Sequence, residues 1–193
     1  SYFTSWGTRA FERGFNQGDQ SEFVFYDYRI DIPVGTATLS LGKTKETISE
    51  VIYEKNASDI APIASVTKLM TAIVIIDSGV PLLESITIAK ADRDRYKGSR
   101  SKLSIGTTLL RAEVLKLALM ASENRASAAL SREFPGGKKA FVLAMNEKAE
   151  ALGMTQTTFV DSTGLRPGNV SSALDLVKLA KAAFAYPLIR QYT

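Results

Sequence analysis

The chain has 193 residues, of which 45% are hydrophobic and 23% charged, as is typical of one globular domain or of one domain with an appendage. This composition excludes a disordered chain, a collagen and a coiled-coil array. Lys and Arg number 24 against 20 Asp and Glu, and the resulting net charge of +4 suggests an anionic environment without requiring nucleic acid as a partner.

The N-terminal region, residues 1–36, is rich in aromatic residues, and its role stays unassigned. A strand is expected over Glu22 to Ile32, where apolar residues alternate before Pro33 and Gly35. Residues 1–15 lack the pattern of a signal peptide, so we expect any export signal to have been removed before this chain begins. The sequence has no apolar run of 18 residues, so we expect no membrane span.

Two further strands are expected, over Thr36 to Leu41 and over Thr47 to Tyr53, joined by a turn at Gly42 to Lys45. Beyond them the pattern is helical, with one short strand at Ile86 to Ile88. The first helix, Ser65 to Ser78, is apolar nearly all round after its first turn, which predicts burial on all sides, and Gly79 ends it. Further helices are expected at Arg111–Met120, Arg125–Phe134, Lys139–Leu152 and Ala173–Tyr186. Strands followed by helices predict an α+β fold with one deeply buried helix.

The composition also restricts the chemistry, because the sequence contains no His and no Cys. A Ser-His-Asp or Cys-His mechanism is therefore excluded, and so are the usual ligand sets for zinc, copper, haem and iron–sulfur clusters. We expect no metal and no cofactor. A nucleophile in this chain has to be a hydroxyl, with Lys, Asp, Glu or Tyr as its base.

The first candidate motif is a Ser-x-x-Lys pattern at the start of the buried helix. Ser65 and Lys68 are three residues apart, so a helix places both side chains on one face. The helix dipole and the apolar surroundings favour the neutral form of Lys68, and a neutral amine beside a hydroxyl is a nucleophile and base pair that needs no His. The structural alternative is an N-capping Ser and a surface Lys.

The second candidate motif, Ser122-Glu123-Asn124, lies in a break between two predicted helices. Ser122 could relay a proton and the amide of Asn124 could bind a substrate carbonyl. The structural alternative is an N-cap for the helix that begins at Arg125.

Together these segments, Pro62–Ala72 and Leu119–Ala126, closely resemble the low-molecular-mass penicillin-binding proteins. The resemblance is closest to the D-alanyl-D-alanine endopeptidase (penicillin-binding protein 7/8) group of the serine S11 peptidases. It extends from about residue 50 to 192 and includes the segments Val51–Ala57, Phe159–Leu165 and Tyr186–Gln191.

The resemblance implies a transpeptidase-like α+β fold, with an antiparallel sheet and a helical lobe whose buried helix carries the nucleophile. On that basis residues 37–193 are expected to form a partial penicillin-binding serine peptidase domain. Ser65 would attack a D-alanyl carbonyl, Lys68 would take its proton, and Ser122 would complete the relay. Asn124 would bind the peptide, and backbone N–H groups, that of Ser65 among them, would hold the oxyanion.

The same resemblance implies a periplasmic enzyme that acts on peptidoglycan peptides and is trapped by penicillin and other β-lactams, with no nucleic acid as a partner. Further cell-wall or membrane-associated partners stay open, and the sequence identifies none. The basic residues between Arg93 and Lys102 are interspersed with Asp and suggest a solvated loop. Asp161 to Gly164 suggests an Asx-type turn that fixes the backbone beside the cleft.

Two alternatives stay open. The family's Lys-Thr-Gly strand is expected downstream of residue 192, whereas this chain ends at Thr193, so its C-terminal part is expected to be missing. The string Gly42-Lys43-Thr44-Lys45 does not replace that strand. A lysine, Lys45, follows Thr44 where the Lys-Thr-Gly strand has the glycine through which a ligand approaches the backbone. A murein-binding pseudoenzyme or a truncated fragment without turnover is therefore the main alternative. A class A β-lactamase is disfavoured, because no clear deacylating Glu loop follows Asn124.

Overall fold

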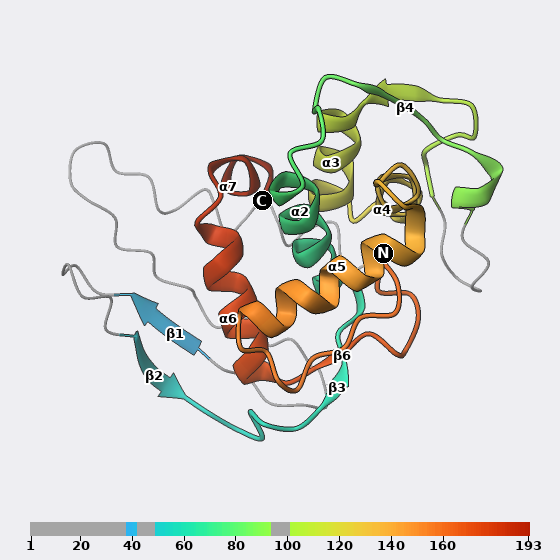
Figure 1. Cartoon of the computed structure of the whole chain (residues 1–193). Coiled ribbons are helices and arrows are strands. Elements are labelled where there is room, and N and C mark those ends of the chain that lie inside the picture. The colour runs from blue at the N-terminus through green and yellow to red at the C-terminus, as the bar shows by residue number, and fades with distance from the viewer. Residues whose placement is uncertain (1–37, 42–48, 94–100) are drawn as a thin grey trace, which may run out of the picture.

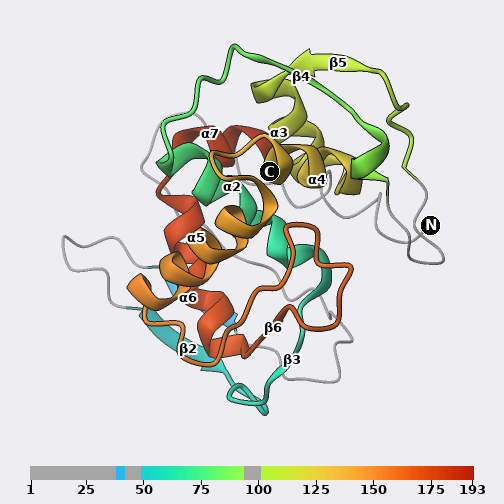
Figure 2. The same cartoon turned by 45° about the vertical axis from the view of Figure 1, so that its right-hand side comes forward.

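The computed structural model describes residues 38–41, 49–93 and 101–193. Figures 1 and 2 show a cluster of helices with short strand pairs at its edges. The helices are α2 (Thr67–Asp77), α3 (Arg111–Met120), α4 (Asn124–Arg132), α5 (Gly137–Ala151), α6 (Ala173–Phe184) and α7 (Pro187–Tyr192). Two 3-10 turns, η1 (Ala64–Val66) and η2 (Lys90–Asp92), precede α2 and follow β4.

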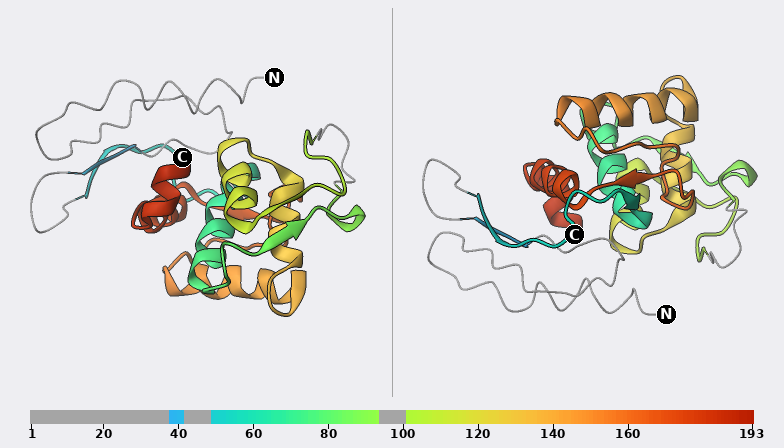
Figure 3. Two further views of the ribbon diagram at one scale, coloured as in Figure 1. Left: turned by 90° about the horizontal axis from the view of Figure 1, so that it is seen from above. Right: turned by 90° about the horizontal axis from the view of Figure 1, so that it is seen from below.

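The described strands form three antiparallel pairs. β1 (Thr38–Leu41) pairs with β2 (Ser49–Tyr53), which confirms these two predicted strands, and Figures 1 and 3 show the pair on the side of the molecule where α6 lies. β4 (Ser85–Thr87) pairs with β5 (Thr108–Leu110). β3 (Ala61–Pro62) pairs with β6 (Val170–Ser171), which joins the segment before η1 to the segment before α6. The predicted α+β class is therefore confirmed.

Helix α2 is the centre of the fold. It contacts α3, α4, α5 and α6, and its side chains Met70, Ala72, Ile73 and Ile75 are fully buried. This confirms the prediction of a helix buried on all sides. The helix ends at Asp77, and Gly79 follows in the left-handed conformation with φ of 66°, a backbone geometry that glycine adopts without strain.

The other helices begin and end close to the predicted residues, with one correction. α3 has the predicted bounds, while α4 and α5 each begin one or two residues earlier than predicted. The helix predicted over Ala173–Tyr186 ends at Phe184, and the separate helix α7 begins at Pro187. Pro187 occupies the first turn of α7, where its missing N–H costs no hydrogen bond.

Some predictions fall partly or wholly outside the described residues. These are the strand over Glu22–Ile32, the turn at Gly42–Lys45 and most of the basic loop between Arg93 and Lys102, of which only the two ends are described; η2 (Lys90–Asp92) directly precedes that loop. The predicted strand at Ile86–Ile88 is β4, shifted by one residue. Among the described residues, none of the helices combines the length and the apolar character that crossing a membrane requires.

Candidate active site

The amine of Lys68 is surrounded by four oxygen atoms from three parts of the chain. Lys68 Nζ lies 3.0 Å from Ser65 Oγ and 3.2 Å from Ser122 Oγ. It also donates hydrogen bonds of 2.9 Å to Asn124 Oδ1 and to the backbone carbonyl of Thr163. The Lys68 side chain is buried, with 3% of the residue exposed. The four residues predicted for the site therefore meet at one buried amine.

Ser65 lies in η1, one turn before α2 proper, and the local backbone explains its position. The preceding residue, Ala64, has φ of 45°, a left-handed conformation that is strained for a residue with a Cβ. Neither η1 nor α2 has a side-chain cap hydrogen bond at its N-terminus. The alternative of an N-capping Ser65 and a surface Lys68 is therefore wrong, because the serine faces a buried amine.

Ser122 and Asn124 come from the break between α3 and α4. Ser122 has φ of 50°, so it is one of three residues other than glycine in the described chain with a left-handed backbone. The N-cap of α4 is Glu123, whose carboxylate accepts a hydrogen bond of 3.2 Å from the backbone N–H of Arg125. Because Glu123 caps the helix, the hydroxyl of Ser122 can face Lys68.

The loop between α5 and β6 supplies the fourth oxygen, and Asp161 shapes it. Asp161 Oδ1 accepts hydrogen bonds from the backbone N–H groups of Thr163, at 2.6 Å, and of Gly164, at 2.7 Å. This is the Asx-type turn that the sequence suggests. The turn directs the Thr163 carbonyl toward α2, where Lys68 contacts it.

Gly164 allows this loop to lie directly against the backbone that precedes Ser65. It has φ of 81°, and a Cβ at this position would overlap the Ala64 carbonyl and lie 2.9 Å from Thr67 Oγ1. A glycine is required here both by the backbone conformation and by the close approach. The contact also braces the strained residue next to the serine.

The number of N–H groups on Lys68 limits what the cluster can do. The carbonyl oxygens of Asn124 and Thr163 can only accept, so they take two N–H groups of the amine. A neutral amine then has its lone pair left for a hydroxyl, whereas an ammonium directs its third proton there. The arrangement can therefore accept the proton of Ser65 and pass one to Ser122 without moving its other two hydrogen bonds.

Sequence reasoning identified the four side chains of the cluster and did not identify the Thr163 carbonyl. That group is a backbone atom, so no residue type at position 163 marks it. It also did not single out Asn169, a fully buried residue that hydrogen-bonds both to the loop and to Thr67. The sequence shows only an Asn shortly before the serines that precede a predicted helix, and its burial becomes visible in the folded chain alone.

Comparison with known protein families identifies the family of this chain. The model of the S11 peptidase family, described as D-alanyl-D-alanine carboxypeptidase, matches residues 44–193, and the chain belongs to this family. The chain is 47% identical over 150 residues to the D-alanyl-D-alanine endopeptidase of Pseudomonas aeruginosa, covering 78% of this chain and 48% of that protein. It is also 47% identical over 143 residues to the endopeptidase of Escherichia coli, covering 74% and 46%. The chain thus spans about half the length of these curated relatives.

Solved structures agree with this assignment. A Streptomyces DD-transpeptidase superposes with a TM-score of 0.68 at 29% identity, over 74% of this chain and 58% of that one. Penicillin-binding protein 6B of Escherichia coli gives a TM-score of 0.69 at 29% identity, over 76% and 50%. The transpeptidase-like fold implied by the sequence resemblance is therefore confirmed.

Proposed function

We propose that this chain is the acylating part of a serine D-alanyl-D-alanine peptidase that acts on peptidoglycan peptides through an acyl-enzyme on Ser65. One observation carries the proposal: the buried amine of Lys68 lies 3.0 Å from Ser65 Oγ while two carbonyl oxygens accept its other hydrogen bonds. A serine activated in this way needs neither His nor a metal.

In the proposed reaction Ser65 Oγ attacks the carbonyl carbon of a D-alanyl residue, and its proton passes to Lys68 Nζ. The C–N bond of the substrate then breaks, and the leaving amine takes a proton from Lys68 through the hydroxyl of Ser122, which lies 3.2 Å from Nζ. Asn124 binds the substrate peptide through its amide. Backbone N–H groups, including that of Ser65, stabilise the oxyanion, and water releases the acyl group.

The degree of sequence similarity to the curated relatives favours an endopeptidase over a carboxypeptidase. The relatives at 47% identity are named endopeptidases, whereas the carboxypeptidase DacF of Bacillus subtilis is 34% identical over 152 residues. We therefore infer that the substrate is a cross-linked peptide whose D-alanyl bond lies within the cross-link. The proposed location is the periplasm, and β-lactams are the expected inhibitors, because they acylate the same serine.

The proposal is tested by the intact mass of the protein after incubation with benzylpenicillin, measured beside Ser65→Ala. The expected result is an increase by one drug molecule, absent from Ser65→Ala. A folded protein that gains no mass after long incubation at high drug concentration would contradict the proposal. The favoured hypothesis would then be the alternative, a murein-binding pseudoenzyme or a truncated fragment without turnover.

Substrate preference needs its own measurement, made by chromatography of digested muropeptides. Release of monomers from a cross-linked dimer is expected for an endopeptidase. Release of free D-alanine from an uncross-linked pentapeptide, with the dimer left intact, would instead indicate a carboxypeptidase.

A further inference from the structure

Asn169 uses every hydrogen-bonding position of its side chain although it is fully buried. Its Oδ1 accepts from the backbone N–H groups of Val160, at 2.7 Å, and of Asp161, at 3.1 Å. Its Nδ2 donates to Thr67 Oγ1 and to the Asp161 carbonyl, both at 2.9 Å. An amide has two acceptor and two donor positions, a set that only Asn and Gln carry, and Gln is one methylene longer.

The same residue holds the chain on both sides of the proposed nucleophile. The backbone carbonyl of Asn169 accepts a hydrogen bond of 3.0 Å from the N–H of Ile63, two residues before Ser65. Its side chain contacts Thr67, two residues after Ser65. Asn169 therefore links the segment Ile63–Thr67, the serine turn, to the loop that carries Thr163.

Three consecutive carbonyls of that loop each receive a side-chain donor. The Asp161 carbonyl accepts from Asn169, and the Ser162 carbonyl accepts from Thr71 Oγ1 at 2.8 Å. The Thr163 carbonyl accepts from Lys68. Thr67, Lys68 and Thr71 all belong to the first turns of α2 and are buried. The two peptide groups before the Thr163 carbonyl are thus fixed, and together with the hydrogen bond from the Gly164 N–H to Asp161 they set the direction of that carbonyl.

We propose that Asn169 is a positioning residue for acyl transfer. The inference rests on the function proposed above and assigns this residue a role within it. By fixing the loop against Thr67, Asn169 places the Thr163 carbonyl where it holds one N–H of Lys68, and this aims the lone pair of the amine at Ser65. A reacting group displaced by about 1 Å can lose roughly a hundredfold in rate, so a distant amide can affect the reaction.

Substitution of the amide separates this role from general stability. Asn169→Asp keeps the shape and both accepted hydrogen bonds but places an oxygen 2.9 Å from the Asp161 carbonyl, where Nδ2 now donates. Repulsion between the two oxygens should push the loop away from α2. Thr67→Val removes only the acceptor of the other Nδ2 bond, and Thr67→Ser restores it.

Asn146 provides a matched control on the same loop. Its Nδ2 donates to the carbonyls of Val142 and Phe159, and its Oδ1 accepts from the Phe159 N–H at 2.9 Å. From α5 it thus holds the beginning of the loop, at Phe159, with two hydrogen bonds, and none of its three hydrogen bonds goes to α2. Asn146→Ala should lower the melting temperature and leave acylation unchanged.

The experiment measures acylation by benzylpenicillin well below the melting temperature, separating the limiting acylation rate from the dissociation constant of the first complex. Asn169→Asp is expected to lower the rate about ten- to a hundredfold with little change in the dissociation constant. Thr67→Val should lower it less, and Thr67→Ser should restore it. Equal rates in Asn169→Asp and the unchanged protein would overturn the proposal, and so would a loss of rate in Asn146→Ala as large as that in Asn169→Asp.

A crystal structure distinguishes failure of the positioning role of Asn169 from failure of the proposed function. If the unchanged protein is not acylated, the function is wrong, but the positioning claim can still be judged from the distance between Lys68 Nζ and the Thr163 carbonyl. That distance should exceed 3.5 Å in Asn169→Asp, whereas a value unchanged from 2.9 Å would overturn the claim. If Asn169→Asp does not fold, Thr67→Val and Thr67→Ser are measured and crystallised in the same way, with the same criteria.

Discussion

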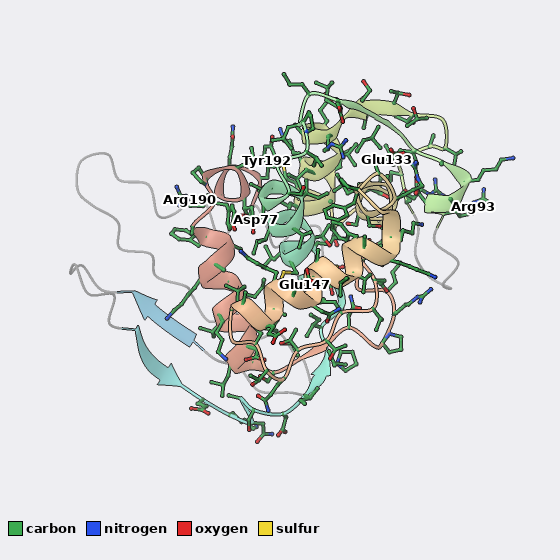
Figure 4. All side chains as sticks on the ribbon, viewed as in Figure 1. Asp77, Arg93, Glu133, Glu147, Arg190 and Tyr192 are labelled. Atoms are coloured by element: carbon green, nitrogen blue, oxygen red, sulfur yellow. The ribbon has the colours of Figure 1, made fainter. Side chains whose placement is uncertain are left out.

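Each end of helix α2 holds a lysine amine among oxygen atoms, and the two sets of oxygens differ in charge. At the N-terminal end, Lys68 Nζ contacts two hydroxyls and two carbonyls, all of them uncharged. At the C-terminal end, Lys148 Nζ from α5 lies 2.7 Å from the carboxylate of Asp77 and 3.5 Å from the hydroxyl of Tyr186. In Figure 4 the labelled Asp77 marks this second end of the helix, near α7.

The two environments act differently on the proton of the amine. The hydrogen bond from Lys148 to Asp77 raises the pKa of that lysine above its ordinary value of 10.5. The position near the negative end of the helix dipole also favours a cation. Lys68 lies at the positive end, where the dipole and burial both oppose its charge. Lys148 is thus held as a structural cation, whereas we propose that Lys68 gives up its proton and regains it during the reaction.

The two ends of α2 also differ in backbone strain. The C-terminal end is followed by Gly79, which adopts a left-handed conformation without strain and has open surroundings. The N-terminal end is flanked by Ala64 and faces Ser122, which hold left-handed conformations in spite of their Cβ atoms. Strain of this kind persists only where neighbouring structure enforces it. It is concentrated at the end where we place the chemistry.

The largest effect is expected from exchanging each lysine for a permanent cation. Lys68→Arg should lower acylation by benzylpenicillin about a hundred- to ten-thousandfold, because a guanidinium does not release its proton at neutral pH. Lys148→Arg should leave the rate unchanged, since an Arg can still pair with Asp77. The measurement is the rate of covalent adduct formation by mass spectrometry, with circular dichroism to verify folding. Rapid acylation of folded Lys68→Arg would contradict the claim that Lys68, unlike Lys148, has to release its proton.

The next effect is on stability and compares a glycine at each end. Gly164→Ala should destabilise the fold by about 4 kcal/mol or more, because its Cβ would overlap backbone at Ala64 while its φ stays at 81°. Gly79→Ala, with φ of 66° and nothing within 4 Å of the added Cβ, should lose only about 1 to 2 kcal/mol. Urea unfolding of both variants provides the comparison. Equal losses would mean that the loop does not lie tightly against the serine turn.

The helices could be predicted from the sequence because their signals are local. The apolar run after Ser65 and the break at Gly79 mark where the central helix begins and ends within one or two residues. The two-residue strands β3 and β6 carry no such signal, and they pair across more than 100 positions of sequence. Their existence depends on where the surrounding helices place them.

The candidate site also contains groups that could be predicted from the sequence and groups that could not. Ser65, Lys68, Ser122 and Asn124 could be proposed because the chemistry requires their side chains at short spacings. The Thr163 carbonyl could not, since every residue has one and its direction is set by hydrogen bonds to Asp161 and α2. Asn169 contacts Thr67 across 102 positions, and only the folded chain brings them together.

The smallest effect is expected from the ion pair at the C-terminal end. Asp77→Asn should destabilise the fold by at most about 1 kcal/mol, because Lys148 and Asp77 are 28% and 38% exposed and water screens their attraction. Acylation should not change, since no atom of this pair contacts the Lys68 cluster. The measurement is urea unfolding at neutral pH, together with the acylation rate. A large loss of acylation in Asp77→Asn would show that the two ends of α2 are coupled.

The pH dependence of this small effect has a definite sign. The pKa of Lys148 is raised by its hydrogen bond to Asp77, and that of Tyr186 is raised above 10.0 by burial and by its hydrogen bond to the same carboxylate. Above about pH 10 the folded protein therefore binds more protons at these groups than the unfolded chain, so their contribution to stability falls as pH rises. The difference in unfolding free energy between the unchanged protein and Asp77→Asn should be constant from pH 7 to 9 and shrink above pH 10. A difference that persists undiminished to pH 11 would mean that Asp77 stabilises the helix end by some means other than charge.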